Sequence, residues 1–120
     1  MLVDRIRWSK LPAGTSAPVA EGRPMRCAVN GKQLILVRWK GALHALEEKC
    51  PHHGESLAGG RIDEGCIVCP RHLYHYDLVT GRGKQHDGGN AATYPVEERR
   101  DGTYIGFTVM TLRLFGRDLW

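Results

Sequence analysis

Two short boxes of Cys and His residues constrain the fold of this chain more than any other feature. The first box is CPHHG at residues 50–54, and the second is CPRH at residues 69–72. Each box offers a thiolate together with an imidazole and is compact enough to close on a single metal centre. Two separate stretches of the chain must therefore fold into two loops that meet at one site.

The candidate ligands are Cys50, His52, Cys69 and His72. Two Cys and two His can hold zinc as a structural site. The order Cys-x-His followed by Cys-x-x-His suits a [2Fe–2S] cluster of mixed ligation, in which one iron takes both thiolates and the other takes both imidazoles. The cluster points to electron transfer, whereas a zinc module would be a colourless structural element.

Turn signals are frequent along the rest of the chain, and helical periodicity is scarce. Asn30-Gly31 lies between two apolar stretches and predicts a hairpin over residues 25–39, because both central residues of the favoured two-residue turn take positive φ. A second hairpin is predicted over residues 93–109, with its turn at Asp101-Gly102.

Short strands are also predicted to lead into the two boxes, at residues 43–46 after the turn at Lys40-Gly41 and at residues 65–68. Several short strands with regular turns predict an all-β fold, a small antiparallel β-sandwich or barrel that carries the boxes on two inserted loops.

The composition describes an ordinary globular domain. A chain of 120 residues predicts one domain, and its net charge of +4 comes without any long run of Lys or Arg, so we expect no nucleic-acid partner. The N-terminus lacks a signal-peptide pattern, and no stretch approaches the roughly 20 apolar residues of a membrane span. Four Cys are too few for a disulfide scaffold. We therefore expect a cytoplasmic protein with no membrane partner.

The boxes and the segments around them resemble the Rieske [2Fe–2S] family, and specifically its small soluble ferredoxins. The likeness extends to the strand at 43–46, to SLAGG at 56–60, to YDLVTG at 76–81 and to YPV at 94–96. It implies one Rieske domain over residues 1–109, with a cluster-binding subdomain at about 47–82 inserted into a β base. Residues 110–120 form an apolar tail.

The resemblance also implies a role for each residue of the boxes. Cys50 and Cys69 would ligate the buried iron, and His52 and His72 would ligate the outer iron near the surface. Gly54 would let the backbone approach a cluster sulfide, where amide donors favour the reduced state.

Several positions depart from the family pattern. Glu55 and Arg71 stand where high-potential members carry the two Cys of a loop disulfide, which places this chain in the low-potential branch and allows an ion pair instead. Tyr76 matches a Tyr that bonds a ligand sulfur in high-potential members, and Tyr74 takes the place of a cluster-bonding Ser. We therefore expect a potential somewhat above that of ordinary Rieske ferredoxins.

Two further departures concern the loops. Leu73 replaces the Gly that commonly follows the second His ligand, so the loop there is not expected to need a positive φ. The segment 83–90 lacks the Pro-containing loop that usually covers the cluster. Of the other candidates, Cys66 and Cys27 are predicted to be core residues rather than ligands, and His53 and His75 to be exposed neighbours of the boxes.

The resulting hypothesis is a one-electron carrier that is not itself an enzyme and takes no small-molecule substrate. It would pass electrons from a reductase to a terminal enzyme, most often an oxygenase. The alternative is a small Rieske-like subunit held permanently in a larger enzyme such as a nitrite reductase. The tail would then serve as a docking or homo-oligomer contact, if it does not lie back on the sheet. Too few residues follow the boxes for a catalytic oxygenase domain.

Overall fold

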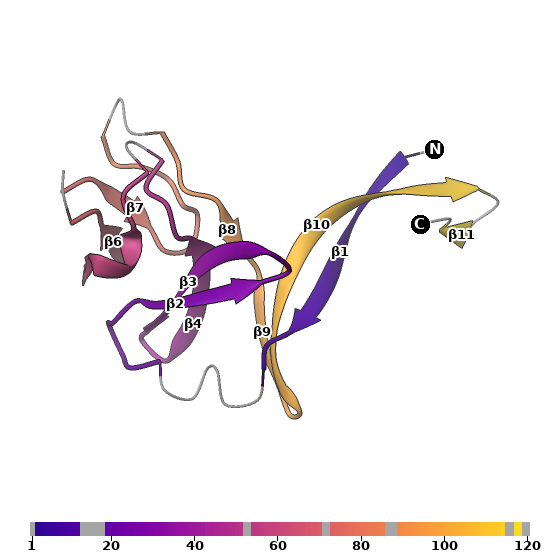
Figure 1. Ribbon diagram of the computed structural model, residues 1–120, viewed down its shortest axis with the longest axis horizontal. Helices are drawn as coiled ribbons and strands as arrows, with labels where there is room; N and C mark the ends of the chain where they lie inside the picture. Colours follow the sequence, from indigo (N-terminus) through magenta and orange to yellow (C-terminus); the bar gives the residue numbers. More distant parts are fainter. Residues whose placement is uncertain are drawn as a thin grey trace.

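The computed structural model describes residues 2–12, 19–51, 54–70, 73–85, 89–114 and 117–118. These residues form antiparallel β-sheets and one short 3-10 helix, η1 (Leu57–Gly59), so the predicted all-β class is confirmed (Figure 1). The strands in chain order are β1 (Leu2–Lys10), β2 (Met25–Val29), β3 (Lys32–Trp39), β4 (Ala42–Glu47), β5 (Arg61–Asp63), β6 (Cys66–Val68), β7 (His75–Asp77), β8 (Thr93–Tyr94), β9 (Val96–Arg99), β10 (Gly102–Leu114) and β11 (Arg117–Asp118).

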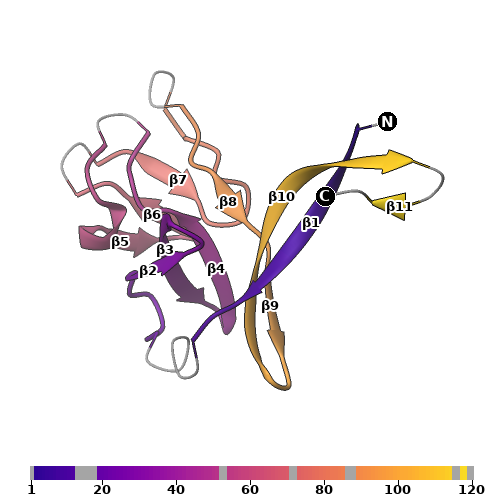
Figure 2. The ribbon, with the colours of Figure 1, turned by 45° about the vertical axis from the view of Figure 1, so that its right-hand side comes forward.

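Three sheets are stacked as layers (Figures 1 and 2). The central sheet has the order β2-β3-β4-β8. On one side lies the sheet of β1, β10 and β9, and on the other lies the small sheet β5-β6-β7, which is inserted in the chain between β4 and β8. The expected base with an inserted subdomain is therefore present.

The central sheet is buried on both faces at β3. Leu34, Ile35, Leu36 and Val37 are all fully buried. Because successive side chains of a strand point to opposite faces, Leu34 and Leu36 enter the core shared with β10, while Ile35 and Val37 enter the core shared with the boxes. A continuous apolar run is what a strand covered on both sides requires.

The predicted turn at Asn30-Gly31 is confirmed, with φ of 52° and 76°, and the turn at Lys40-Gly41 has nearly the same geometry. A third turn of this kind, at Glu64-Gly65, joins β5 to β6 and was not predicted. It was missed because β5 is only three residues long and contains a single apolar residue.

The second predicted hairpin is present with two differences. Gly102 pairs with Arg99, so the turn residues are Arg100 and Asp101 and Gly102 already belongs to β10. The first strand of the hairpin is interrupted at Pro95, which has no N–H for a ladder hydrogen bond.

A long two-stranded ribbon extends away from the layers. β1 pairs with β10 from Lys10↔Tyr104 to Leu2↔Leu112, and the far end of the ribbon lies opposite the loops of the small sheet (Figures 1 and 2). The boundary predicted after residue 109 falls inside β10. The side chains of residues 110–120 lie outside the described part of the chain, so the contacts of the tail stay a prediction.

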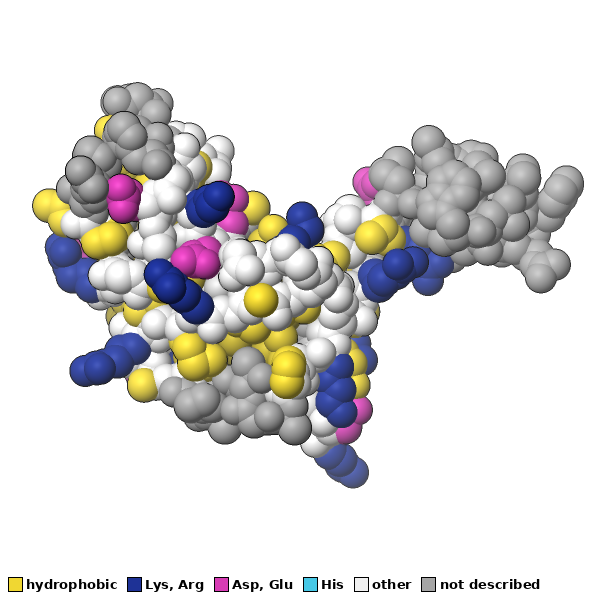
Figure 3. Space-filling model, in the orientation of Figure 1, with side chains coloured by type: hydrophobic (Ala, Val, Ile, Leu, Met, Phe, Trp, Pro, Cys, Tyr) yellow, Lys and Arg dark blue, Asp and Glu magenta, His cyan; other side chains and the backbone are white. Residues whose placement is uncertain are grey.

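Charged side chains are dispersed over the surface. On the face shown in Figure 3, Lys and Arg lie scattered among Asp and Glu. Some of them pair: Arg38 lies 2.9 Å from Glu98, and Arg26 lies 3.0 Å from Glu48. None of the helical structure in the described residues is long and apolar enough to span a membrane.

Candidate functional site

The two boxes are closed by the same pattern of backbone hydrogen bonds. In each, the Cys N–H donates to the carbonyl five residues later, and the Cys carbonyl accepts from the N–H four residues later. The bonds are Cys50 N to Glu55 O (2.7 Å), Gly54 N to Cys50 O (2.7 Å), Cys69 N to Tyr74 O (2.8 Å) and Leu73 N to Cys69 O (3.0 Å). The first loop follows β4 and the second connects β6 to β7. The chain thus builds two loops of matching shape, each starting at a Cys.

The fifth residue of each loop has a left-handed backbone, with φ of 75° at Gly54 and 57° at Leu73. The expectation that Leu73 would relieve the second loop of a positive φ is therefore wrong. Closing the loop onto the carbonyl of Cys69 imposes this conformation whichever residue occupies the position. For an L-residue it costs about 1–2 kcal/mol.

Both thiols of the boxes are buried. Cys50 is 1% exposed and Cys69 is fully buried, and both belong to the core between the central sheet and the small sheet. Neither forms a disulfide. The predicted ligands His52 and His72 lie outside the described residues, as do His53 and Arg71, so the ion pair between Arg71 and Glu55 stays a prediction.

The hydroxyl of Tyr76 lies 3.4 Å from Sγ of Cys50. Tyr76 belongs to β7, pairs with Ile67 of β6 and is fully buried. Burial raises its pKa well above the usual value, and the hydrogen bond to Cys50 and the charges of Cys50 and Cys69 raise it further. The hydroxyl therefore keeps its proton and donates when the sulfur is a thiolate.

The other two residues expected beside the cluster lie in the loops themselves. Gly54 is exposed, and a Cβ built on it would meet no atom of the described residues beyond its chain neighbours within 4 Å, so its positive φ is what requires glycine. Tyr74 packs against the same core as the two thiols, and its carbonyl closes the second loop.

Cys66 and Cys27 are core residues, as predicted. Cys66 is 4% exposed in β6 and Cys27 is 8% exposed in β2. Burial raises the pKa of both thiols, which disfavours the thiolate that a metal needs. The Cys66-x-x-Cys69 spacing is therefore a consequence of the strand that enters the second box.

Amide side chains hold the outer edge of the second box, and sequence reasoning missed them. Oε1 of Gln85 accepts from the N–H of His75 (3.0 Å), and its Nε2 donates to the carbonyl of His75 (3.3 Å). The carboxamide thus pairs with β7 as a neighbouring strand would. Further on, Asn90 accepts from the N–H of Gly83 (3.0 Å). No periodic pattern signals such contacts.

The segment that carries these amides returns to the first box. A Cβ built on Gly89 would lie 3.9 Å from Cβ of Pro51. The described part of 83–90 therefore reaches the boxes without a proline, held by the amides of Gln85 and Asn90.

The side chain of His75 links the loop of the second box to β5. Its Nδ1 lies 3.0 Å from the carbonyl oxygen of Leu73, and its Nε2 lies 3.5 Å from a carboxylate oxygen of Asp63. His75 is thus a partly exposed neighbour of the box, as predicted, and it also supports the loop.

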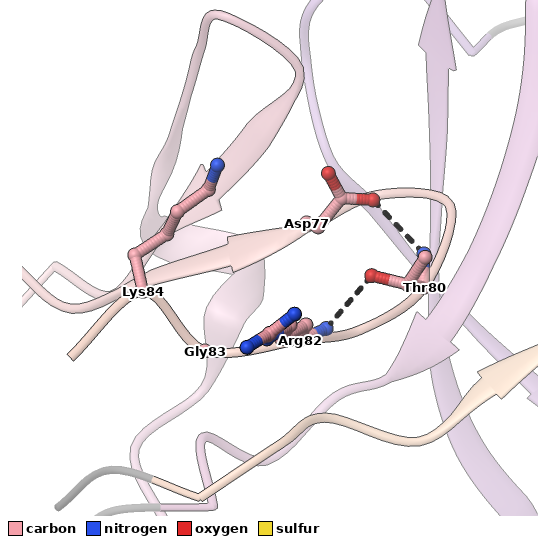
Figure 4. A pocket seen from close by; sticks show the side chains of 5 residues that line it. All are labelled: Asp77, Thr80, Arg82, Gly83 and Lys84. Carbon is pink, nitrogen blue, oxygen red and sulfur yellow. Dashed lines mark hydrogen bonds between the residues drawn. The ribbon is translucent and has the colours of Figure 1, made fainter. Parts of the chain in front are cut away.

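A tight turn follows β7 and is held by one carboxylate (Figure 4). Oδ1 of Asp77 accepts from the N–H of Val79 (2.8 Å) and of Thr80 (2.9 Å), and Thr80 Oγ1 accepts from the N–H of Arg82 (3.1 Å). The backbone N–H bonds to Asp77, that of Thr80 foremost and then that of Val79, lower the pKa of this carboxyl. The turn borders a pocket of about 290 Å³, lined by Asp77, Thr80, Arg82, Gly83 and Lys84. Of the predicted ligands that the structure describes, neither Cys50 nor Cys69 lines this pocket.

Comparison with known proteins identifies the family. A model of the Rieske [2Fe-2S] domain matches residues 9–95, which include both boxes, the central sheet and the small sheet. The chain belongs to the Rieske [2Fe-2S] domain family. The all-β fold and the matched loops are those of a Rieske domain, and the cofactor of such a domain is one Rieske-type [2Fe–2S] cluster.

The relatives of this Rieske domain range from a small ferredoxin component to a much larger enzyme. It is 28% identical over 93 residues to the ferredoxin component of the naphthalene 1,2-dioxygenase system of Pseudomonas putida, covering 77% of this chain and 88% of that protein. It is 30% identical over 84 residues to a human Rieske domain-containing protein, covering 67% of this chain. It is 33% identical over 112 residues to the nitrite reductase [NAD(P)H] of Emericella nidulans, covering 80% of this chain.

The matches differ in how much of each relative they span. The Rieske domain covers 54% of the human protein and only 10% of the nitrite reductase. Among solved structures, it matches one of a complex of reduced oxygenase and oxidized ferredoxin in carbazole 1,9a-dioxygenase. That match has a TM-score of 0.69 at 25% identity and covers 82% of this chain and 91% of the other.

The described residues fit a Rieske cluster. Two buried thiols lie on loops of matching shape, and a protonated tyrosine hydroxyl is directed at one of them. Thiolates buried in a core need a positive partner, and iron supplies it.

Replacing Asp77 tests the turn that follows the second box. Because the folded pKa is lowered, the stabilisation is complete above the ordinary value of 3.8 and is lost as the pH falls through the lowered pKa. We expect Asp77→Ala to reduce the free energy of unfolding by about 1–2 kcal/mol at pH 7, measured by urea unfolding. Asp77→Asn keeps the acceptor and should lose less. A loss for Asp77→Ala that stays constant into acid would contradict this account.

Proposed function

We propose that this Rieske domain is a one-electron carrier that takes electrons from a reductase and delivers them to a terminal oxygenase. The observation that carries the proposal is the likeness to a ferredoxin component over 88% of that component's length. Because the match spans nearly the whole ferredoxin component, it supports the role of an electron carrier for this domain. We propose that the domain has no catalytic site of its own. We expect it to act in the cytoplasm, in keeping with four cysteines of which none forms a disulfide.

Within the proposal, Cys50 and Cys69 bind one iron and His52 and His72 bind the other. The cluster supplies a single redox couple that accepts and releases one electron. The protein excludes water from the two thiolates, which are almost completely buried, and the hydroxyl of Tyr76 donates to Cys50 Sγ. Because reduction adds negative charge, a donor to a ligand sulfur favours the reduced state.

A second candidate is a subunit held permanently within a larger redox enzyme. The observation in its favour is the 33% identity to a nitrite reductase. A free carrier is expected to elute alone in size-exclusion chromatography, whereas a subunit is expected to co-purify with a much larger protein.

The ligand set is tested by single replacements. We expect Cys50→Ala, His52→Ala, Cys69→Ala and His72→Ala each to lose most of the bound iron and sulfide. Cys66→Ala is the matched control, since it removes a buried thiol three residues from Cys69 and should keep the cluster. The readouts are iron and sulfide content and the electron paramagnetic resonance (EPR) spectrum of the reduced protein. A colourless protein that binds zinc would contradict the assignment.

The carrier role is tested by reconstitution. The naphthalene 1,2-dioxygenase system of Pseudomonas putida, assembled without its own ferredoxin component, should regain oxidation of naphthalene when this protein is added. The Cys69→Ala variant should restore none. If the cluster-loaded protein is reduced by the reductase and yet supports no oxygenase turnover, the proposed delivery to an oxygenase is wrong.

Replacing Tyr76 tests how the potential is set. We expect Tyr76→Phe to lower the midpoint potential by tens of millivolts, since about 1 kcal/mol of net hydrogen-bond energy corresponds to roughly 40 mV for one electron. Tyr94→Phe, a half-buried tyrosine of β8 that stacks on Phe107, is the control and should leave the potential unchanged. The raised pKa of Tyr76 keeps its hydroxyl protonated, so the difference should persist from pH 6 to pH 10. Equal potentials measured by voltammetry would remove Tyr76 from the account.

A further inference from the structure

Leu73 is unlike the other described residues that have a left-handed backbone. Asn30, Lys40 and Glu64, the other non-glycine examples, are polar, and each precedes a glycine in a two-residue hairpin turn. Leu73 is apolar and branched and stands in the loop of the second box, at φ 57°. Its side chain is nevertheless 56% exposed.

The backbone at Leu73 is held without help from this side chain. Its N–H donates to the carbonyl of Cys69, and its carbonyl oxygen lies 3.0 Å from Nδ1 of His75. The side chain belongs to neither of the two described cores. Glycine or asparagine would take the same conformation at lower cost in free energy. The fold therefore gives no reason for a leucine at this position. A strained backbone that does not contribute to packing is characteristic of functional positions.

The position of Leu73 beside the second box indicates a contact with a redox partner. Leu73 directly follows His72, the proposed ligand of the outer iron. The described box residues that are exposed are Pro51, Gly54 and Pro70, and none of them carries a charge. Leu73, directly after the second box, is exposed as well. A redox partner must come against the boxes to exchange an electron, and the centre of a protein interface is typically apolar and depleted in charge. Leu73 is the largest of these exposed apolar side chains.

We propose that Leu73 is a docking contact that inserts into an apolar surface of the oxygenase, beside the point where the electron leaves. This inference rests on the proposed function. The partner that Leu73 contacts is the oxygenase to which the carrier delivers electrons. A structure similar to this chain is that of a ferredoxin in complex with an oxygenase, so such a pair of proteins does form a defined complex.

The experiment compares Leu73→Asn with Val79→Asn in the reconstituted naphthalene 1,2-dioxygenase assay. Asparagine tolerates the left-handed backbone, so Leu73→Asn should fold and melt at the wild-type temperature or higher. We expect its KM as a carrier to rise about tenfold, with kcat at saturation and midpoint potential unchanged. Val79 is 70% exposed in the turn after β7, so its replacement removes an equally exposed apolar side chain and should leave KM unchanged. Leu73→Met keeps a large apolar side chain, so its KM should stay close to that of the wild type.

The outcomes separate this inference from the proposal beneath it. If the wild-type protein supports no oxygenase turnover, the proposed function fails. If the wild-type protein is active and Leu73→Asn has the same KM, the docking role of Leu73 is wrong. If the midpoint potential of Leu73→Asn shifts together with KM, the side chain shields the cluster, and the docking role is again overturned.

Discussion

Burial of β3 on both faces is the constraint on which the rest of the structure depends. Alternate side chains of β3 supply the base core and the core beneath the boxes, so a single strand belongs to both. The small sheet has only three-residue strands, and a sheet of that size needs a second layer to be stable. The second layer is the outer face of β3 and β4. The positions of Cys50 and Cys69 are therefore fixed by packing against the base.

The same pattern of backbone hydrogen bonds closes the two loops that carry the proposed ligands. Each Cys starts a loop whose own hydrogen bonds turn the chain back, which satisfies the peptide groups near the thiolate without help from distant residues. The loops differ in their fifth residue, where Gly54 takes the left-handed conformation freely and Leu73 does so under strain. His75 and Gln85 support the second loop from β7 and from the segment that follows it.

The sequence predicted the features that depend on local signals. The apolar run at 34–37 and the turns at Asn30-Gly31 and Lys40-Gly41 were recognisable because their geometry is encoded within a few residues. β1 was missed because it carries charged residues on both faces and pairs with a strand about 100 residues away. The backbone of Leu73 was mispredicted because a hydrogen bond to Cys69, and not the residue type, decides it. The hydrogen bonds of the Gln85 side chain to β7 could not be predicted, because no periodic pattern in the sequence indicates them.

The ribbon of β1 and β10 has a consequence for how such a domain can be joined to other proteins. The start of β1, the end of β10 and the short strand β11 lie on the side of the molecule opposite the boxes (Figures 1 and 2). A further domain, a surface tether or a label attached through either strand would lie far from the electron-transfer end. The same layout would let one Rieske module work as a free carrier or as a segment of a larger chain, since neither arrangement requires the boxes to move.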